Sequence, residues 1–218
     1  MRGGVMLAPM TEVRTSEPAD VTTVRTPQGE RTRVMRLRLM EATVECLVEL
    51  GWSGTTTTVV SRRAGVSRGA QLHHFPSKLD LVVAAVEYLA ERRRDELQSA
   101  IGDLPEEGRT RAVLDVLAAQ FTSPVFFAAL ELWVAARTDQ SLHAAVGPLE
   151  RRLGRETHQQ AVELLRVDET RGRNRQLVQG TLDLLRGLGL AASLSDDSAR
   201  RATILDAWAT TLDRDLET

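Results

Sequence analysis

The chain has 218 residues, of which 42% are hydrophobic and 27% are charged, and its formal net charge is −2. This composition is ordinary for a globular protein with a sizeable core, and it excludes a mainly disordered chain. Cys46 is the only cysteine, which excludes an intramolecular disulfide and a cysteine-based zinc cluster and suits a reducing cytoplasm. The apolar runs at 82–86 and 125–130 are soon interrupted by Glu87 and Glu131, so we expect no membrane span.

The charge is unevenly distributed along the chain. Residues 31–80 hold eight basic and four acidic residues, a balance of +4, whereas residues 81–218 carry a balance of −5. A basic N-terminal module on an acidic body is typical of a DNA-binding domain attached to a domain with another role. Without a supporting motif, the same charges would be described equally well as solvated faces.

The N-terminal part divides into an arm and a helix. Residues 1–30 are rich in Thr, Pro and Gly and show no periodic apolar face, so we expect a flexible arm. From residue 33 to residue 50, apolar residues recur at helical spacing, which predicts an amphipathic helix that ends at Gly51. Its basic residues, Arg33 among them, lie in its first half and could reach a phosphate backbone; simple solvent exposure is the alternative.

The stretch 55–78 indicates two short helices joined by a tight turn. Threonines led by Thr55 stand where the first helix begins, and a hydroxyl at that position can accept a bond from a free backbone N–H. Gly65 follows at the helix end, where glycine adopts positive φ without a Cβ clash.

The second short helix of this stretch has its own boundary signals. Ser67 suits its N-cap, and the helix then runs over residues 68–74. Pro76 ends it, because the residue before a proline is pushed out of the α region. Helix, glycine turn and capped helix form the helix-turn-helix pattern, whose second helix enters the DNA major groove.

Over roughly residues 33–80 the chain resembles the TetR family of one-component transcriptional regulators. The residues that carry the resemblance are Thr55, Thr56, Ala64, Gly65, Val66, Ser67, Gly69, His74, Phe75, Pro76, Ser77 and Lys78. Members of the family often have an aromatic residue where this chain has Leu72 and an apolar residue where it has Gln71. Leu72 therefore lacks the aromatic hydroxyl that would contact a phosphate.

The resemblance implies an all-α fold with two parts. The first is an N-terminal three-helix DNA-binding domain with the helix-turn-helix, which we place at residues 31–76. The second is a C-terminal helical ligand-binding and dimerisation domain, which we place at residues 77–218. It also implies a homodimer on a palindromic operator in double-stranded DNA, with one half-site for each short recognition helix.

The candidate DNA contacts are the basic, hydroxyl and small residues around the two short helices. They are Arg33, Thr55, Thr56, Thr57, Ser67, Arg68, Gly69, Ala70, Gln71, His73, His74 and Lys78. Arg68 could donate two bonds to O6 and N7 of a guanine, which discriminates between bases by roughly 1–3 kcal/mol. Gly69 permits a close approach to the groove, and Ala70 could contact a thymine methyl. Gln71 is either a base reader or a solvated helix residue.

The two histidines need a separate interpretation. His73 could touch a phosphate or a base edge, while His74 and Lys78 could hold phosphate. Adjacent histidines can also indicate metal binding, but no third or fourth ligand stands at a suitable spacing, so we expect no metal site.

Beyond Pro76 the pattern is helical to the end, with no strand alternation. Expected helices span 77–101, 109–121, 124–138, 141–146, 148–167, 175–188 and 196–216. The family's final helix pair packs against its mate as a four-helix bundle, which implies an interface through Leu177, Thr181, Leu184, Leu188, Leu205, Trp208 and Leu212. The alternative is that both helices only complete the core of their own subunit.

An effector would bind among the middle helices, where the few aromatic and ring residues gather. Ligand pockets are largely apolar with a few polar groups, and we select Trp133, Arg137 and His143 as pocket residues for a small apolar effector. The family mechanism implies a population shift, in which the ligand stabilises a conformer that releases the operator. The expected function is therefore that of a repressor.

Two other classes of function are an enzyme and a protein–protein adaptor. No phosphate loop, dinucleotide fingerprint or paired metal motif occurs, and GWSGT at 51–55 follows a helix and lacks the spacing of a nucleophile elbow. We therefore expect no catalysis and no cofactor. A helical protein–protein adaptor that keeps the helix-turn-helix only for packing remains the alternative, and it would show no duplex affinity to lose with salt.

Overall fold

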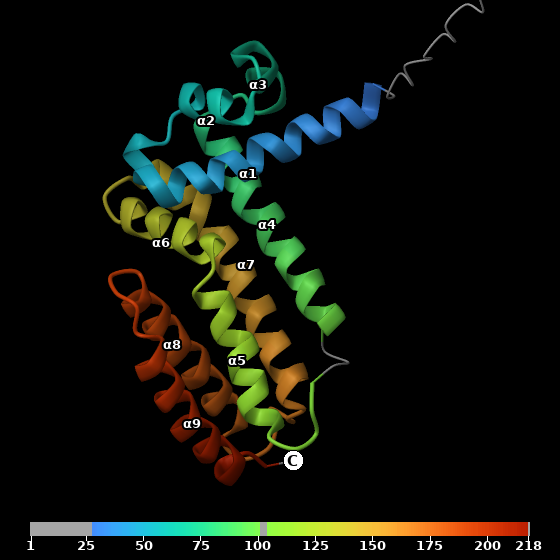
Figure 1. Cartoon of the computed structure of the whole chain (residues 1–218), viewed down its shortest axis with the longest axis vertical. Coiled ribbons are helices and arrows are strands. Elements are labelled where there is room, and N and C mark those ends of the chain that lie inside the picture. Colours follow the sequence, from blue (N-terminus) through green and yellow to red (C-terminus); the bar gives the residue numbers. More distant parts are fainter. Residues whose placement is uncertain (1–27, 101–103, 218) are drawn as a thin grey trace, which may run out of the picture.

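The computed structural model describes residues 28–100 and 104–217, so the arm expected over 1–30 lies almost entirely outside the described residues. Its helices are α1 (Gln28–Gly54), α2 (Thr57–Ala64), α3 (Arg68–His74), α4 (Lys78–Ala100), α5 (Arg109–Phe121), α6 (Pro124–Ala136), α7 (Gln140–Leu165), α8 (Asn174–Ala192) and α9 (Ser198–Asp215). No strand occurs in this part of the chain, which confirms the all-α fold class. Helices α1 to α3 form one end of the molecule, and α8 and α9 lie side by side away from it (Figure 1).

Helix α1 begins at Gln28, five residues before the expected start. Glu30 lies in its first turn, where a carboxylate opposes the positive end of the helix dipole, and it pairs with Arg33 at 2.9 Å. These local interactions explain why a segment without a periodic apolar face is helical. The expected helix end at Gly51 is a break in helical geometry (φ 65°, ψ −177°), after which one more turn reaches Gly54.

Two caps and one glycine shape the helix-turn-helix. The hydroxyl of Thr56 accepts a bond of 3.2 Å from a backbone N–H of α2, so the N-cap is Thr56 and not Thr55. Helix α2 ends at Gly65, which is left-handed (φ 64°, ψ 33°) as expected. Ser67 is the N-cap of α3, because its Oγ accepts a bond of 3.2 Å from the N–H of Ala70.

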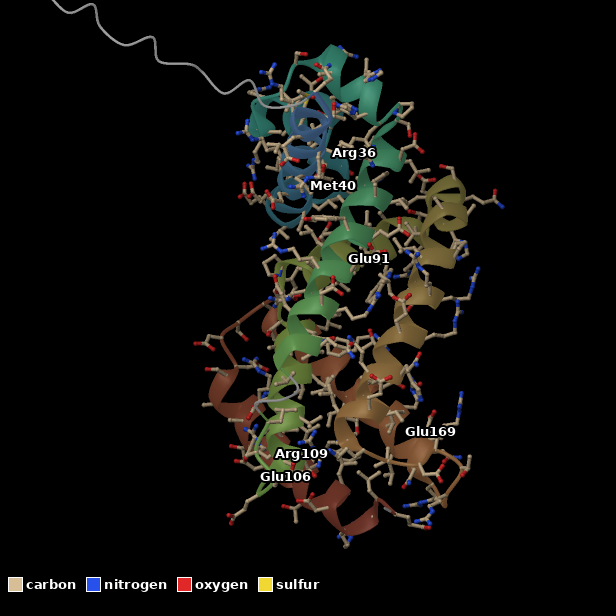
Figure 2. All side chains as sticks on the ribbon, turned by 90° about the vertical axis from the view of Figure 1, so that its right-hand side faces the viewer. Arg36, Met40, Glu91, Glu106, Arg109 and Glu169 are labelled. Carbon is tan, nitrogen blue, oxygen red and sulfur yellow. The ribbon has the colours of Figure 1, made fainter. Side chains whose placement is uncertain are left out.

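Helix α4 connects the N-terminal helices to the rest of the chain. The N–H of Asp80 donates to the hydroxyl of Ser77 at 3.1 Å, and the N–H of Ser77 donates back to the Asp80 carboxylate at 3.1 Å. This reciprocal pair is a capping box, which explains where the helix begins. From there α4 runs beside α7 along the molecule (Figure 2).

Helix α7 replaces two expected helices. The sequence predicted a break between 141–146 and 148–167, but α7 continues through Pro148. A proline removes one helical hydrogen bond and leaves the carbonyl four residues earlier without a donor. Both Ala144 and Pro148 lie on the exposed face of α7, where water can satisfy that carbonyl. The helix therefore tolerates the proline that we had interpreted as a boundary.

The buried side chains form two cores. The first joins α1, α2, α4, α6 and the first part of α7, with Leu39, Leu47 and Leu132 among its buried members. The second joins α5, α8, α9 and the last part of α7, together with Leu97 of α4 and Phe126 of α6. Trp133, on α6, packs against both cores. Helix α6 therefore links the N-terminal domain to the body of the protein.

By length and composition, no single helix in the described part of the chain could cross a membrane, and α5 with α6, bent by 55° at their junction, passes that test only as a pair.

Candidate functional site

The outer face of α3 is exposed. Ser67, Arg68, Gly69 and His73 all lie on it, and Ala70 is half-buried beside them. Arg68 forms no hydrogen bond or ion pair with any other described residue. An unpaired guanidinium next to a glycine can approach the edges of bases in a groove.

The structure places Gln71 inside the domain, with an exposed fraction of 0%. Its Nε2 donates a hydrogen bond of 2.7 Å to the carbonyl of Phe75, while its Oε1 has no partner among the described residues. Residues 71 and 75 are one turn apart, so both face inward from the short helix. The interpretation of Gln71 as a DNA contact is therefore wrong, and so is the alternative of a solvated residue.

The predicted threonines divide in the same way. Thr55 is 1% exposed, and its hydroxyl donates to the carbonyl of Gly51 at 2.8 Å. Thr55 therefore holds the junction between α1 and α2, and its prediction as a DNA contact is wrong. Thr56 is exposed and Thr57 is half-buried at the first turn of α2, where both remain predicted contacts.

Lys78 is engaged inside the protein. Its ammonium donates to the carbonyl of Trp52 at 2.5 Å and lies 3.5 Å from the centroid of the indole ring. Burial removes water from the ammonium and lowers the pKa of Lys78 below its ordinary value. Lys78 thus fastens α4 to the end of α1 instead of standing free to bind phosphate.

The basic side chains of α1 have individual environments. Arg36 lies at the α2 and α3 end of the molecule (Figure 2), with its guanidinium 4.7 Å from the ring centroid of Phe75. Burial, followed by the positive charges of His73 and Arg36, lowers the pKa of half-buried His74. The guanidinium of Arg33 is exposed but paired with Glu30, so only part of its charge is available to a partner.

Leu72 is a surface residue that the sequence reasoning did not include among the contacts. It is 43% exposed, although it is a large apolar side chain. It stands four residues after Arg68, so both project from the same face of α3. Helical spacing alone could have placed Leu72 on this face.

A cavity of about 140 Å³ lies between α4, α5, α6 and α7, with α8 at its edge. Trp133 lines the cavity. Arg137, the C-cap of α6, and His143, in the first turn of α7, are both exposed, and the structure places these two predicted pocket residues outside this cavity.

The predicted interface residues on α8 and α9 lie mostly inside the subunit. Thr181, Leu188, Leu205 and Leu212 are at most 5% exposed, and the three leucines belong to the second core. These four are unavailable to another subunit, so their prediction is wrong. Leu177, Leu184 and Trp208 are half-buried, and Trp208 donates an indole hydrogen bond of 2.9 Å to Thr181 that ties α9 to α8.

The outer face of α8 carries small and apolar residues instead. Gly180, Leu184, Gly187 and Ala191 share one side of the helix, and each is half-buried or exposed. A Cβ added at Gly180 or Gly187 would meet no atom within 4 Å. Residues 28–100 and 104–217 therefore leave open space above this strip.

Known proteins share both the motif and the fold. The family model described as bacterial regulatory proteins, tetR family, matches residues 39–85. The chain is 37% identical over 123 residues to the HTH-type transcriptional regulator CymR of Pseudomonas putida, covering 56% of this chain and 61% of that one. It is 27% identical over 163 residues to the HTH-type transcriptional regulator BetI of Escherichia coli O127:H6, covering 74% and 84%. A putative transcriptional regulator from Pseudomonas aeruginosa PAO1 has a crystal structure that matches with a TM-score of 0.64 at 25% identity, covering 89% of this chain and 95% of that one.

These findings define the chain as a helix-turn-helix protein with a helical C-terminal domain. The matched residues 39–85 run from the middle of α1 into α4 and include the whole helix-turn-helix. Over these residues the chain is similar to the TetR family of bacterial regulatory proteins. Both named relatives are described as HTH-type transcriptional regulators. The match to CymR spans about three-fifths of that protein's length.

Proposed function

We propose that the protein is a sequence-specific DNA-binding regulator in the cytoplasm, which acts as a repressor and binds a palindromic operator as a homodimer. The observation that carries this proposal is the exposed face of α3. Arg68 stands there unpaired, beside Gly69 and one turn before Leu72. The Ser67 cap and the Gly65 turn fix the orientation of this helix, as a base-reading helix requires.

A homodimer follows from the shortness of α3, which has seven residues. One such helix reaches few base pairs, so specific affinity needs two half-sites about one helical turn apart. The strip of Gly180, Leu184, Gly187 and Ala191 supplies a surface on which a second copy could pack closely. Partly buried Trp208 lies on the neighbouring helix and would enlarge this interface.

The cavity supports regulation by a small molecule. It is bounded by α4 and α6, and these helices also pack on α1. A ligand that fits the cavity better in one arrangement of α4 and α6 would shift the spacing of the two recognition helices. The proposed outcome of ligand binding is release from the operator.

The test of DNA binding is selection from a random duplex library at near-physiological salt, carried out with the wild type and with Arg68→Ala. We expect a palindromic consensus from the wild type. In the variant, the preference at one position of each half-site should relax, with a discrimination loss of roughly 1–3 kcal/mol. Arg200→Ala is the matched control, because Arg200 is an exposed arginine on α9, far from α3 in the chain. Enrichment of no sequence by the wild type would contradict the proposal.

The protein–protein adaptor is the alternative, and salt separates the two functions. A DNA-binding regulator that neutralises several phosphates loses affinity steeply between low and moderate salt. An adaptor shows no duplex affinity at either salt concentration. Fluorescence anisotropy with an unselected duplex at about 50 and about 200 mM salt measures this directly.

The dimer is tested at Gly187. The Cβ of Gly187→Leu would meet no atom of the described residues within 4 Å, and the substitution replaces a poor helix former with a good one, so the subunit should remain folded. In a dimer packed through this strip, the added side chain would separate the two copies. We expect a monomer by sedimentation with an unchanged helical spectrum, and a dimer of wild-type stability would contradict the proposed interface.

A further inference from the structure

The cavity has an apolar side built from aromatic rings. The ring of Phe126 meets Phe121 edge-on at 5.5 Å and Trp133 at 5.9 Å between centroids, and all three residues line the space. An apolar cavity of about 150 Å³ is known to hold benzene. The observed volume of about 140 Å³ therefore suits a compact body about the size of one ring.

Three arginines line the same cavity, and two of them are neutralised at short range. Arg94 pairs with Glu156, which also lines the cavity. Arg186 pairs with Asp183 at 2.7 Å. The charges of Arg94 and Arg186 are already compensated by carboxylates of the chain, so an anionic ligand would gain little from pairing with them.

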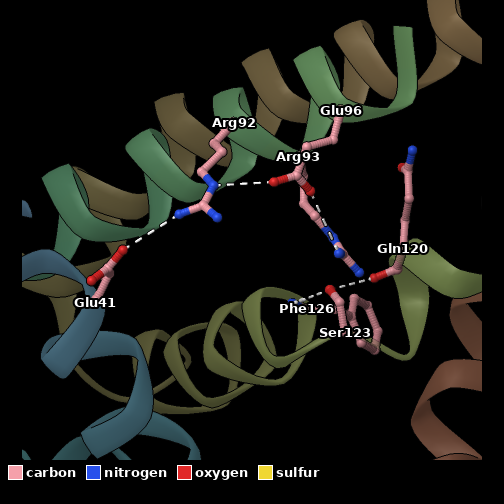
Figure 3. A network of polar contacts seen from close by, with 7 residues as sticks. All are labelled: Glu41, Arg92, Arg93, Glu96, Gln120, Ser123 and Phe126. Atoms are coloured by element: carbon pink, nitrogen blue, oxygen red, sulfur yellow. Dashed lines mark hydrogen bonds and ion pairs between the residues drawn. The ribbon is translucent and has the colours of Figure 1, made fainter. Parts of the chain in front are cut away.

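The third arginine belongs to a balanced network (Figure 3). Arg93 lies 3.8 Å from the carboxylate of Glu96, which also accepts a bond of 3.1 Å from Arg92. Arg92 in turn lies 3.4 Å from Glu41 on α1. Two cations and two anions therefore alternate, and the network as a whole is neutral.

Glu150 is the lining charge without a partner. It is half-buried on α7 and forms no hydrogen bond or ion pair with any described residue. The guanidinium of Arg186 lies 5.9 Å from the ring centroid of Phe121 and 6.0 Å from that of Trp133. The aromatic rings thus already accept a cation, and the uncompensated charge among the lining residues is negative.

Gln160 adds a polar feature to the cavity. Its Nε2 is buried and has no hydrogen-bond partner among the residues that the structure describes, although it can donate two hydrogen bonds. Because a buried donor without an acceptor is destabilising, an acceptor on a bound molecule would satisfy it. A ligand for this space therefore combines a positive charge, an apolar ring-sized body and one acceptor.

We propose that the cavity between α4, α5, α6 and α7 binds a compact organic cation, whose charge pairs with Glu150 and whose acceptor bonds to Gln160. This inference rests on the proposed effector role and names the chemical class of that effector. A neutral apolar molecule would leave the charge of Glu150 uncompensated. A carboxylate would face that charge at close range while the arginines remained paired.

The test uses calorimetry of the full chain without DNA, with three probes that share one ring: benzyltrimethylammonium, benzyl alcohol and benzoate. In the wild type, the cation should bind at least about tenfold more tightly than either other probe. Glu150→Gln should weaken the cation about tenfold and leave benzyl alcohol unchanged. Gln160→Leu should weaken benzyl alcohol and leave the cation, which has no acceptor, unchanged.

Glu163→Gln is the matched control, because Glu163 is exposed on the same helix and does not line the cavity. It should leave the affinities of all three probes unchanged. Tighter binding of benzoate, equal effects of Glu150→Gln and Glu163→Gln, or no binding of any probe at millimolar concentration would each overturn the proposal. The order of the three probe affinities is measured on the wild type, so this part of the test does not depend on whether any variant folds. Operator selection is a separate measurement, so failure here leaves the proposed DNA binding standing.

Discussion

Replacing Gly51 by alanine tests how the end of α1 is built. Gly51 has φ 65° and ψ −177°, a region that residues with a side chain essentially do not occupy. A Cβ at this position would lie 2.9 Å from the carboxylate of Glu131 on α6. Because strained backbone of this kind costs about 1–3 kcal/mol, we expect Gly51→Ala to lower the free energy of unfolding by about 3 kcal/mol.

Gly65→Ala is the matched comparison. Gly65 is left-handed (φ 64°, ψ 33°), and a Cβ there would meet no atom within 4 Å. Its replacement should cost about 1 kcal/mol. Both substitutions reduce the conformational entropy of the unfolded chain by the same amount. The difference of about 2 kcal/mol between their losses in free energy of unfolding therefore measures the extra strain in the folded state at Gly51.

Urea unfolding followed by circular dichroism measures the free energy of unfolding of both variants. Glu131→Ala, alone and combined with Gly51→Ala, completes a double-mutant cycle. The contacting atom belongs to the end of a flexible side chain, which can move aside. The coupling between the two positions should therefore be below about 0.5 kcal/mol, because strain and not the contact dominates. If Gly51→Ala is no more destabilising than Gly65→Ala, or if Glu131→Ala restores the loss, the reasoning about backbone strain is refuted.

Three further predictions concern α3. Ser67→Ala should destabilise the protein by about 1 kcal/mol in urea, whereas Ser67→Gly should cost only a few tenths, because glycine is also a good N-cap; equal losses would exclude the capping role. Leu72→Ala should reduce a preference for thymine in operator selection, since its apolar side chain projects beside Arg68, and an unchanged consensus would remove Leu72 from the reading face. Because burial lowers the pKa of His74, the unfolded chain takes up a proton at a higher pH than the folded chain, and stability should fall as pH drops below about 6.5. Urea midpoints at about pH 7.5 and 5.5 should show this slope in the wild type and a flatter one in His74→Gln; equal slopes would exclude His74 as its source.

Local signals in the sequence predicted the local structure well. The left-handed glycine at Gly65, the serine cap of α3 and the break at Gly51 each depend on a few neighbouring residues. The continuity of α7 was not predictable in this way, because a proline on an exposed helix face is tolerated through water. The predicted helix boundary at Pro148 was therefore wrong because solvent exposure allows the helix to continue through the proline.

Residue type and sequence pattern predicted only some of the functional residues, because the environment of the others is set by tertiary packing. Glutamine is usually a surface residue, so residue type predicts an exposed Gln71, and only the packing of α3 on the domain shows that it is buried. The apolar face of α8 was correctly recognised, but the pattern cannot say whether a neighbouring helix or a second subunit covers it. Leu188 and Leu205 prove to be covered by their own subunit. Pocket residues such as Trp133 depend on tertiary arrangement, so residue type alone selected one lining residue and two exposed ones.

The position of Trp133 gives the protein a built-in optical reporter. Its indole ring lines the cavity and packs against both cores, whereas the other two tryptophans, Trp52 near the end of α1 and Trp208 in the middle of α9, do not line that space. In a chain whose other two tryptophans are replaced by phenylalanine, emission would come from this single ring. One unlabelled fluorescence trace would then follow cavity filling and any movement between the two cores at the same time.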